Sequence, residues 1–200
     1  MNEQALKQFF KILNRFMVWM WRLGLGKWIN IWPAGIGRIM VLIHTGRKSG
    51  LKRRTPVNYA VVDGDLYCVA AFGQSADWLR NIQAMPEVQV WLPEGWWTAE
   101  AQLVEDTPAR LPVIRQILIN SGFAAYAFEG IKPRKMSDSE LAQLSDPYQL
   151  VRIRCIRQVT GPGAMADLAW VWQAAAGSLL VYWLFWRVFR KNRLISRKLG

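Results

Sequence analysis

The residues best suited to chemistry lie in one short stretch, the turn that runs from His44 to Gly50. It holds a threonine, followed by two cations and a serine between two glycines, and five cations without an acid fall between Arg47 and Arg54. A glycine-bounded turn can direct several backbone N–H groups into one concavity, and adjacent lysine and arginine side chains add charged donors. Phosphate and carboxylate groups bind to such an arrangement. The turn therefore predicts an anion site, and the alternative is a solvated basic loop.

Strands on either side must hold this turn in place. Val41–Ile43 is a short apolar run before it, and Asp63-Gly64, a hairpin signal, follows it. Alternating apolar and polar residues farther along are typical of a half-buried sheet, and Thr107 begins a helix that reaches about Ser121. The strands are expected over residues 41–43, 55–62, 66–71, 98–104 and 150–155.

The segment from His44 to Tyr59 resembles the signature of the deazaflavin-dependent nitroreductase family, whose members bind coenzyme F420. It reads His-Thr-Gly-Arg-Lys-Ser-Gly-Leu-Lys-Arg-Arg-Thr-Pro-Val-Asn-Tyr. The resemblance covers roughly residues 39–130, and several linked motifs make it more specific than a single glycine pattern. Further matches follow at Asp63–Asp65, Val69–Gly73, Asp77–Asn81 and Met85–Val90.

The resemblance implies an α+β fold built on a split β-barrel of the FMN-binding type, with the cofactor in a cleft beside the sheet. The cofactor-binding domain would span residues 39–160. An amphipathic helix and linker would precede it in residues 1–38, and a hydrophobic helix with a basic tail would follow in residues 161–200.

The resemblance also implies which residues hold the cofactor. The turn would bind the phosphate and glutamyl arm, and Arg53 would add an anion contact. Pro56 and Val57 would approach the deazaflavin ring, while Trp78 and Asn81, one helical turn apart, would face the cleft. The whole implied set is Thr45, Gly46, Arg47, Lys48, Arg53, Pro56, Val57, Ala70, Ala71, Phe72, Gly73, Trp78 and Asn81.

The sequence departs from the family at one point. Better-known members have a lysine and two glycines after the third strand, whereas this chain has Ala71-Phe72-Gly73-Gln74 and lacks that phosphate-binding cation. The departure leaves FMN, FAD or haem as alternative cofactors, as in relatives on the same barrel. The five cations near the turn still favour the polyanionic arm of coenzyme F420.

No side chains in the sequence are spaced for acid–base or nucleophilic catalysis on their own. The chain has one histidine, His44, and its two cysteines, Cys68 and Cys155, stand apart in predicted strands, so neither a metal site nor a disulfide framework is indicated. Such a chain suits chemistry done by a cofactor. The resemblance implies hydride transfer from the reduced deazaflavin to an electron-poor acceptor. The product's proton would come from Tyr126, which lies in an aromatic run, or from water; the alternative is that Tyr126 is a core residue.

The charge of the chain is concentrated at its ends. Its formal net charge is +12; residues 1–38 hold six Lys or Arg and one acid, and residues 187–200 hold six and none. Residues 39–186 are nearly balanced, with fourteen cations and thirteen acids. A nucleic-acid-binding domain would carry its basic surface on the folded body. The terminal charges therefore favour an anionic membrane surface over nucleic acid.

The N-terminal segment predicts an amphipathic helix. Between Ala5 and Trp21 apolar residues recur at helical spacing, with Lys7, Lys11 and Arg15 on the other side. These charges argue against both a membrane span and a signal peptide. The helix is expected to lie in the membrane interface or, as the alternative, to pack on the domain.

The C-terminal segment is the more hydrophobic of the two. Leu168 to Trp186 is nineteen residues without a charge, close to the roughly 20 apolar residues that a span needs. Trp and Tyr at both ends are typical of an aromatic belt, and a cationic tail follows. Three alternatives stay open: a single-pass span, a helix in one leaflet, and a buried or dimer-forming helix.

These terminal features predict attachment to the cytoplasmic face of the cell membrane, either membrane-associated or single-pass. A membrane-attached reductase would act on a lipid-soluble acceptor, so a quinone is the expected substrate. The expected partners are this small-molecule acceptor, the lipid surface, and a possible homodimer or membrane complex.

A second hypothesis is that the barrel does not catalyse a reaction. Phe72 in place of a phosphate-binding lysine, together with the elaborate termini, would suit a non-catalytic, membrane-attached binding or scaffold subunit. The two hypotheses differ in one observable property, the uptake of a deazaflavin chromophore by the purified protein.

Overall fold

The computed structural model describes residues 3–30, 37–105, 109–122, 132–159, 168 and 170–196. The structure has six strands and several helices, in agreement with the predicted α+β class. In chain order they are α1 (Glu3–Arg22), α2 (Gly26–Ile29), β1 (Ile39–Thr45), β2 (Lys52–Val62), β3 (Asp65–Ala70), the 3-10 turn η1 (Gly73–Ser75), α3 (Asp77–Ala84), β4 (Glu87–Leu92), β5 (Gly95–Leu103), α4 (Arg110–Asn120), α6 (Asp138–Ser145), β6 (Gln149–Val159) and α7 (Trp170–Ser196).

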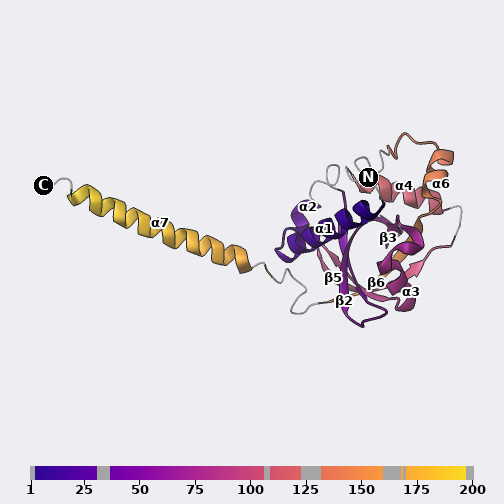
Figure 1. Cartoon of the computed structure of the whole chain (residues 1–200), viewed down its shortest axis with the longest axis horizontal. Coiled ribbons are helices and arrows are strands. Elements are labelled where there is room, and N and C mark those ends of the chain that lie inside the picture. Colours follow the sequence, from indigo (N-terminus) through magenta and orange to yellow (C-terminus); the bar gives the residue numbers. More distant parts are fainter. Residues whose placement is uncertain are drawn as a thin grey trace.

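The six strands are antiparallel and close into a barrel in the order β1-β2-β3-β6-β5-β4 (Figure 1). β4 pairs back with β1, as Val41 opposite Trp91 shows, so the sheet has no open edge along this seam. The hairpin between β2 and β3 turns at Asp63-Gly64, where both residues have positive φ (50° and 85°), as the sequence predicted for this tight turn. The barrel is the expected fold class.

Within the described residues, three apolar clusters stabilise the barrel: an inner core inside it, an outer core under α4 and α6, and a third cluster that joins Trp21 of α1 to β1, β4 and β5. The inner core is made of inward-facing residues from all six strands together with Leu79 and Ile82 of α3. The outer core forms where α4 and α6 cover β2, β3 and β6, with Ile114 and Leu141 fully buried. Alternation along β2, β3 and β6 therefore supplies one face to the inner core and the other to the outer core, which fixes the register of these strands.

The basic turn is shorter than the sequence suggested, because β2 begins at Lys52 rather than at Thr55. Arg53 pairs with His44 across the β1–β2 ladder, and Arg54 pairs with Ile43. Three of the five cations are thus strand residues whose side chains alternate between the two faces of the sheet. Only Arg47 and Lys48 belong to the turn itself.

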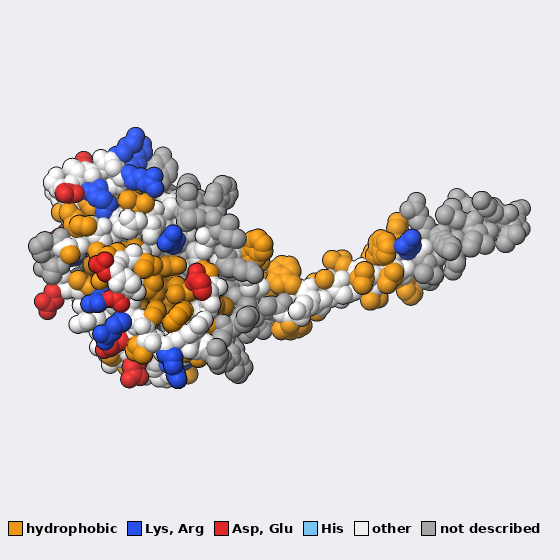
Figure 2. Space-filling model, turned by 180° about the vertical axis from the view of Figure 1, so that it is seen from behind, with side chains coloured by type: hydrophobic (Ala, Val, Ile, Leu, Met, Phe, Trp, Pro, Cys, Tyr) orange, Lys and Arg blue, Asp and Glu red, His pale blue; other side chains and the backbone are white. Residues whose placement is uncertain are grey.

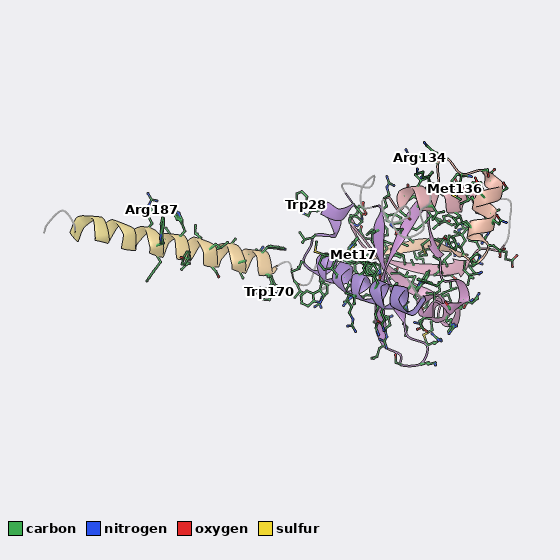
Figure 3. All side chains as sticks on the ribbon, turned by 45° about the horizontal axis from the view of Figure 1, so that its top comes forward. Met17, Trp28, Arg134, Met136, Trp170 and Arg187 are labelled. Carbon is green, nitrogen blue, oxygen red and sulfur yellow. The ribbon has the colours of Figure 1, made fainter. Side chains whose placement is uncertain are left out.

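Helix α1 lies across the barrel, with its C-terminal end fixed by tryptophans (Figures 1 and 3). Trp21 is 1% exposed and meets Trp91 edge to face, with ring centroids 5.3 Å apart, and Trp91 stacks on Trp96 at 4.8 Å. The packed-helix alternative is therefore correct for this end of α1.

The opposite side of α1 faces solvent and is apolar. Ile12, Phe16 and Trp19 are 67%, 57% and 54% exposed, although their spacing places them on one side of the helix. An amphipathic helix of a globular domain normally turns its apolar side to the core. Here the apolar stripe, which we define as Ile12, Phe16 and Trp19, points outward.

Helix α7 extends away from the barrel as an isolated rod (Figure 1). Figure 2 shows hydrophobic side chains spread along it, and Figure 3 places Trp170 where it leaves the body and Arg187 toward its far part. The helix continues through Ser196, so the predicted basic tail is largely helical too.

Among the residues that the structure describes, α7 included, no helix is both long enough and apolar enough to cross a bilayer. Tryptophan, tyrosine, glutamine, glycine and serine occupy much of the uncharged part of α7, and all of them rank well below leucine, isoleucine, valine and phenylalanine in hydropathy. The single-pass alternative for residues 168–186 is therefore not supported.

Candidate active site

A cleft of about 970 Å³ opens where the basic turn, β2, α3 and α1 meet. Its size suits a cofactor-sized ligand. Ten of the residues implied by the family resemblance line it: Gly46, Arg47, Lys48, Arg53, Pro56, Val57, Ala71, Phe72, Trp78 and Asn81.

Three implied residues do not line the cleft. The hydroxyl of Thr45 accepts a hydrogen bond from Nζ of Lys52 at 3.1 Å, and Ala70 is buried in the inner core. Gly73 has a φ of +51°, and a Cβ at this position would lie 2.5 Å from the carbonyl oxygen of Pro147. These residues shape the neighbouring backbone. Tyr126 lies outside the described residues, so its role as a proton donor stays a prediction.

Arg47 is the best-fixed cation of the cleft. Its guanidinium donates to the carboxylate of Asp77 at 3.2 Å and to Oδ1 of Asn81 at 3.0 Å, and its backbone N–H also donates to Oδ1 of Asn81, at 3.1 Å. Asp77 and Asn81 both belong to α3, so Arg47 fastens the turn to that helix. The carboxylate of Asp77 also neutralises part of the positive charge of Arg47.

Three other cations of the cleft are available to a ligand. In the described part of the chain, Lys48, Arg53 and Arg54 have no carboxylate partner, and all three are exposed. Uncompensated cations at a cleft rim attract and bind polyanionic groups. These three residues fit an anionic arm better than Arg47 does.

A buried chain of hydrogen-bonded polar side chains lies beneath the basic turn and the start of β2. His44 is 2% exposed, with Nδ1 3.2 Å from Nδ2 of Asn81 and Nε2 3.0 Å from Oγ1 of Thr55. Burial first, and then the nearby charges of Arg53 and Lys52, lower the pKa of His44 to about 4. The imidazole is therefore neutral at neutral pH and serves as a link in the chain rather than as a cation.

Apolar side chains form the remaining wall of the cleft. Pro56, Val57, Phe72 and Trp78 line it, and the last three also pack against the inner core. A wall of this kind suits a planar ring system, because aromatic and aliphatic side chains exclude water from both of its faces. Cationic rim and apolar wall together fit a cofactor that joins aromatic rings to an anionic arm.

Several residues that line this cleft were not predicted from the sequence. Thr55 and His44 come from the matched segment, and Lys11 and Asn14 come from α1. Lys11 and Asn14 are three residues apart on the polar side of α1. This spacing was the signal in the sequence that both side chains face the same way. The prediction placed this side in solvent or near lipid headgroups, whereas the structure places it over the cleft.

A closed antiparallel barrel with such a cleft defines a cofactor-binding barrel protein. The model of the F420H2-dependent quinone reductase family matches residues 13–129, so the chain belongs to this family. It is accordingly an oxidoreductase, its cofactor is coenzyme F420, and the resemblance drawn from the basic turn is confirmed. The non-catalytic scaffold hypothesis is not supported.

Solved structures resemble the chain more distantly. An F420H2-dependent reductase (FDR-A) is 23% identical, over 58% of this chain and 93% of that one, with a TM-score of 0.40. A conserved hypothetical protein from Mycobacterium tuberculosis is 19% identical over 60% of this chain and 74% of its own, with a TM-score of 0.42. The heme storage protein HutZ from Vibrio cholerae is 16% identical over 60% and 82%, with a TM-score of 0.43. Among curated proteins none matches the chain.

Proposed function

We propose that this protein reduces a lipid-soluble quinone with F420H2 bound in the cleft beside β2. The observation that carries this proposal is the pairing of unneutralised cations, Lys48, Arg53 and Arg54, with an apolar wall in one cleft. Bound F420H2 supplies a hydride. A quinone is an acceptor of that hydride, and the name of the family supports this choice.

Some side chains of the cleft would bind the cofactor, and others would hold the binding groups in place. Lys48, Arg53 and Arg54 bind the phosphate and glutamyl carboxylates, each contact being charge-assisted. Val57 and Trp78 pack against the ring system and exclude water from it. Arg47, tied to α3, holds the turn so that the backbone N–H groups keep their direction without a ligand. The protein thus contributes preorganisation rather than an acid–base group of its own.

We further propose that the enzyme works at the surface of an anionic membrane. The apolar stripe of α1 supports this, because Ile12, Phe16 and Trp19 face outward beside Arg15 and Arg22. Exposed tryptophans next to cations are the composition of an interfacial helix. Such a location would bring the cleft close to acceptors dissolved in the bilayer.

The proposal is tested by titrating the purified protein with oxidised F420 and, in parallel, with FMN, following the fluorescence of each. We expect binding of F420 and much weaker binding of FMN, which lacks the glutamyl carboxylates. Lys48→Ala should weaken F420 binding by 1.5–3 kcal/mol, the approximate value of a lost charge-assisted hydrogen bond. Lys52→Ala is the matched control, because Lys52 is bonded to Thr45 and does not line the cleft. Equal affinities for the two variants would overturn the assignment of this cleft.

A further inference from the structure

The contacts behind the cleft form one chain of hydrogen bonds whose direction can be worked out. The chain runs from Arg47 through Asn81 and His44 to Thr55, with separations of 3.1, 3.2 and 3.0 Å. Each link has one donor and one acceptor, so fixing the first link fixes the rest.

The first link is fixed because Arg47 can only donate. Its backbone N–H and its guanidinium NH1 both approach the same atom of Asn81, at 3.1 and 3.0 Å. That atom must be the carbonyl oxygen of the amide, Oδ1. Asn81 therefore presents its Nδ2 group, a donor, to the ring of His44.

The second link fixes the tautomer of His44. Because Nδ2 of Asn81 donates, Nδ1 of His44 must accept and carries no proton. His44 is buried and neutral, so its single proton is on Nε2. Nε2–H then donates to Oγ1 of Thr55.

The last link makes the hydroxyl oxygen of Thr55 an acceptor within the chain. Its hydroxyl oxygen accepts from His44, so its own proton is not used within the chain, and Thr55 lines the cleft. Thr55 also lies between Arg53 and Val57 on the same side of β2, between a rim cation and the apolar wall.

We propose that Thr55 donates a hydrogen bond to bound coenzyme F420, with its hydroxyl oriented by the chain that starts at Arg47. It would bind an acceptor atom of the cofactor, such as a carbonyl oxygen, a ring nitrogen or a phosphate oxygen. This inference rests on the placement of F420 in this cleft. His44 and Asn81 act through Thr55, as positioning residues.

The direction of the chain can be measured without any cofactor. The protein has one histidine, so nitrogen-15 NMR of labelled protein reports His44 alone. We expect a protonated Nε2 and an unprotonated Nδ1 at pH 7.5. A proton on Nδ1 would make Thr55 the donor to His44 and would overturn the inference, whether or not F420 binds.

The role of Thr55 is measured in F420 titrations of three variants. Thr55→Val should weaken binding about tenfold, whereas Thr55→Ser, which keeps the hydroxyl, should stay near wild type. Thr45→Val is the matched control, because the Thr45 hydroxyl bonds to Lys52 outside the cleft. Thermal unfolding of each variant identifies loss of fold, and if Thr55→Val does not fold, the tautomer of His44 decides.

A parallel titration of Lys48→Ala separates this inference from the proposed function. Weak binding by Lys48→Ala with unchanged binding by Thr55→Val would overturn the role of Thr55 and leave the cofactor cleft in place. Unchanged binding by both variants would overturn the cleft as the cofactor site and the inference with it.

Discussion

The indole Nε1–H of Trp172 donates a hydrogen bond of 2.8 Å to the backbone carbonyl oxygen of Leu23. This contact joins the first turn of α7 to the residue that follows α1. A second bond, 2.9 Å from the N–H of Leu168 to the carbonyl oxygen of Arg22, lies beside it. The end of α1 and the start of α7, far apart in sequence, therefore lie at one corner of the barrel.

The proposed membrane surface predicts that a charge in the apolar stripe of α1 prevents vesicle binding. Ile12→Glu should lower the affinity for vesicles with anionic lipid at least tenfold, because it removes about 2 kcal/mol of apolar burial and adds repulsion. Cosedimentation measures this directly. Ile156→Glu is the matched control, since Ile156 on β6 is 66% exposed and Ile12 is 67% exposed. Comparable binding by both variants, or no binding by wild type, would contradict the proposed surface.

The placement of Lys11 over the cleft predicts that α1 contributes to ligand binding. Lys11→Ala should weaken F420 binding about fivefold to tenfold, because it removes an exposed cation from the wall of the cleft. Arg15→Ala removes the same charge from the same helix at a position outside the cleft, so its affinity should match wild type. If the two variants behave alike, α1 affects binding only through net charge.

Much of the fold could be read from the sequence, because its signals are local. The Asp63-Gly64 hairpin, the apolar run that became β1 and the alternation that became β6 were all found near their observed positions. The basic turn of the cleft was also found, since glycines and cations in one short segment are a local pattern.

The remaining features depend on packing between distant segments. The ladder with β1 extends β2 back to Lys52, which no propensity of Lys52–Arg54 indicates. The orientation of α1 is set by the contact of Trp21 with Trp91, so its polar side faces the cleft. Gly73 matched a family motif, but its tight approach to Pro147 is visible only in three dimensions.

The approach of Gly73 to Pro147 predicts a large effect of a single methyl group. Gly73→Ala places a Cβ 2.5 Å from the carbonyl oxygen of Pro147 at a φ of +51°, so both the contact and the backbone oppose it. We expect the free energy of unfolding to fall by about 2–4 kcal/mol. Gly64→Ala, with a φ of +85° and nothing within 4 Å, should cost only about 1 kcal/mol. Equal losses in urea unfolding would show that the contact with Pro147 relaxes.

The buried, neutral state of His44 predicts a specific dependence of stability on pH. The folded pKa of about 4 lies below the usual histidine pKa of 6.5, so between these pH values the unfolded chain binds more protons than the folded one. The stabilising contribution is therefore complete above pH 6.5 and is lost as the pH falls toward 4. Integration gives a loss of roughly 3 kcal/mol between pH 7 and pH 4.

His44→Gln isolates this contribution, because it keeps a donor near Thr55 and cannot titrate. Carboxylates titrate in both proteins, so the difference in urea-unfolding free energy between wild type and variant reports His44 alone. We expect wild type to lose roughly 3 kcal/mol more than His44→Gln over this range. Parallel pH profiles for the two proteins would mean that His44 is protonated in the folded state at pH 4–6. A second proton on the ring would then require Asn81 to turn its oxygen toward His44, and the directed chain to Thr55 would be wrong at those pH values.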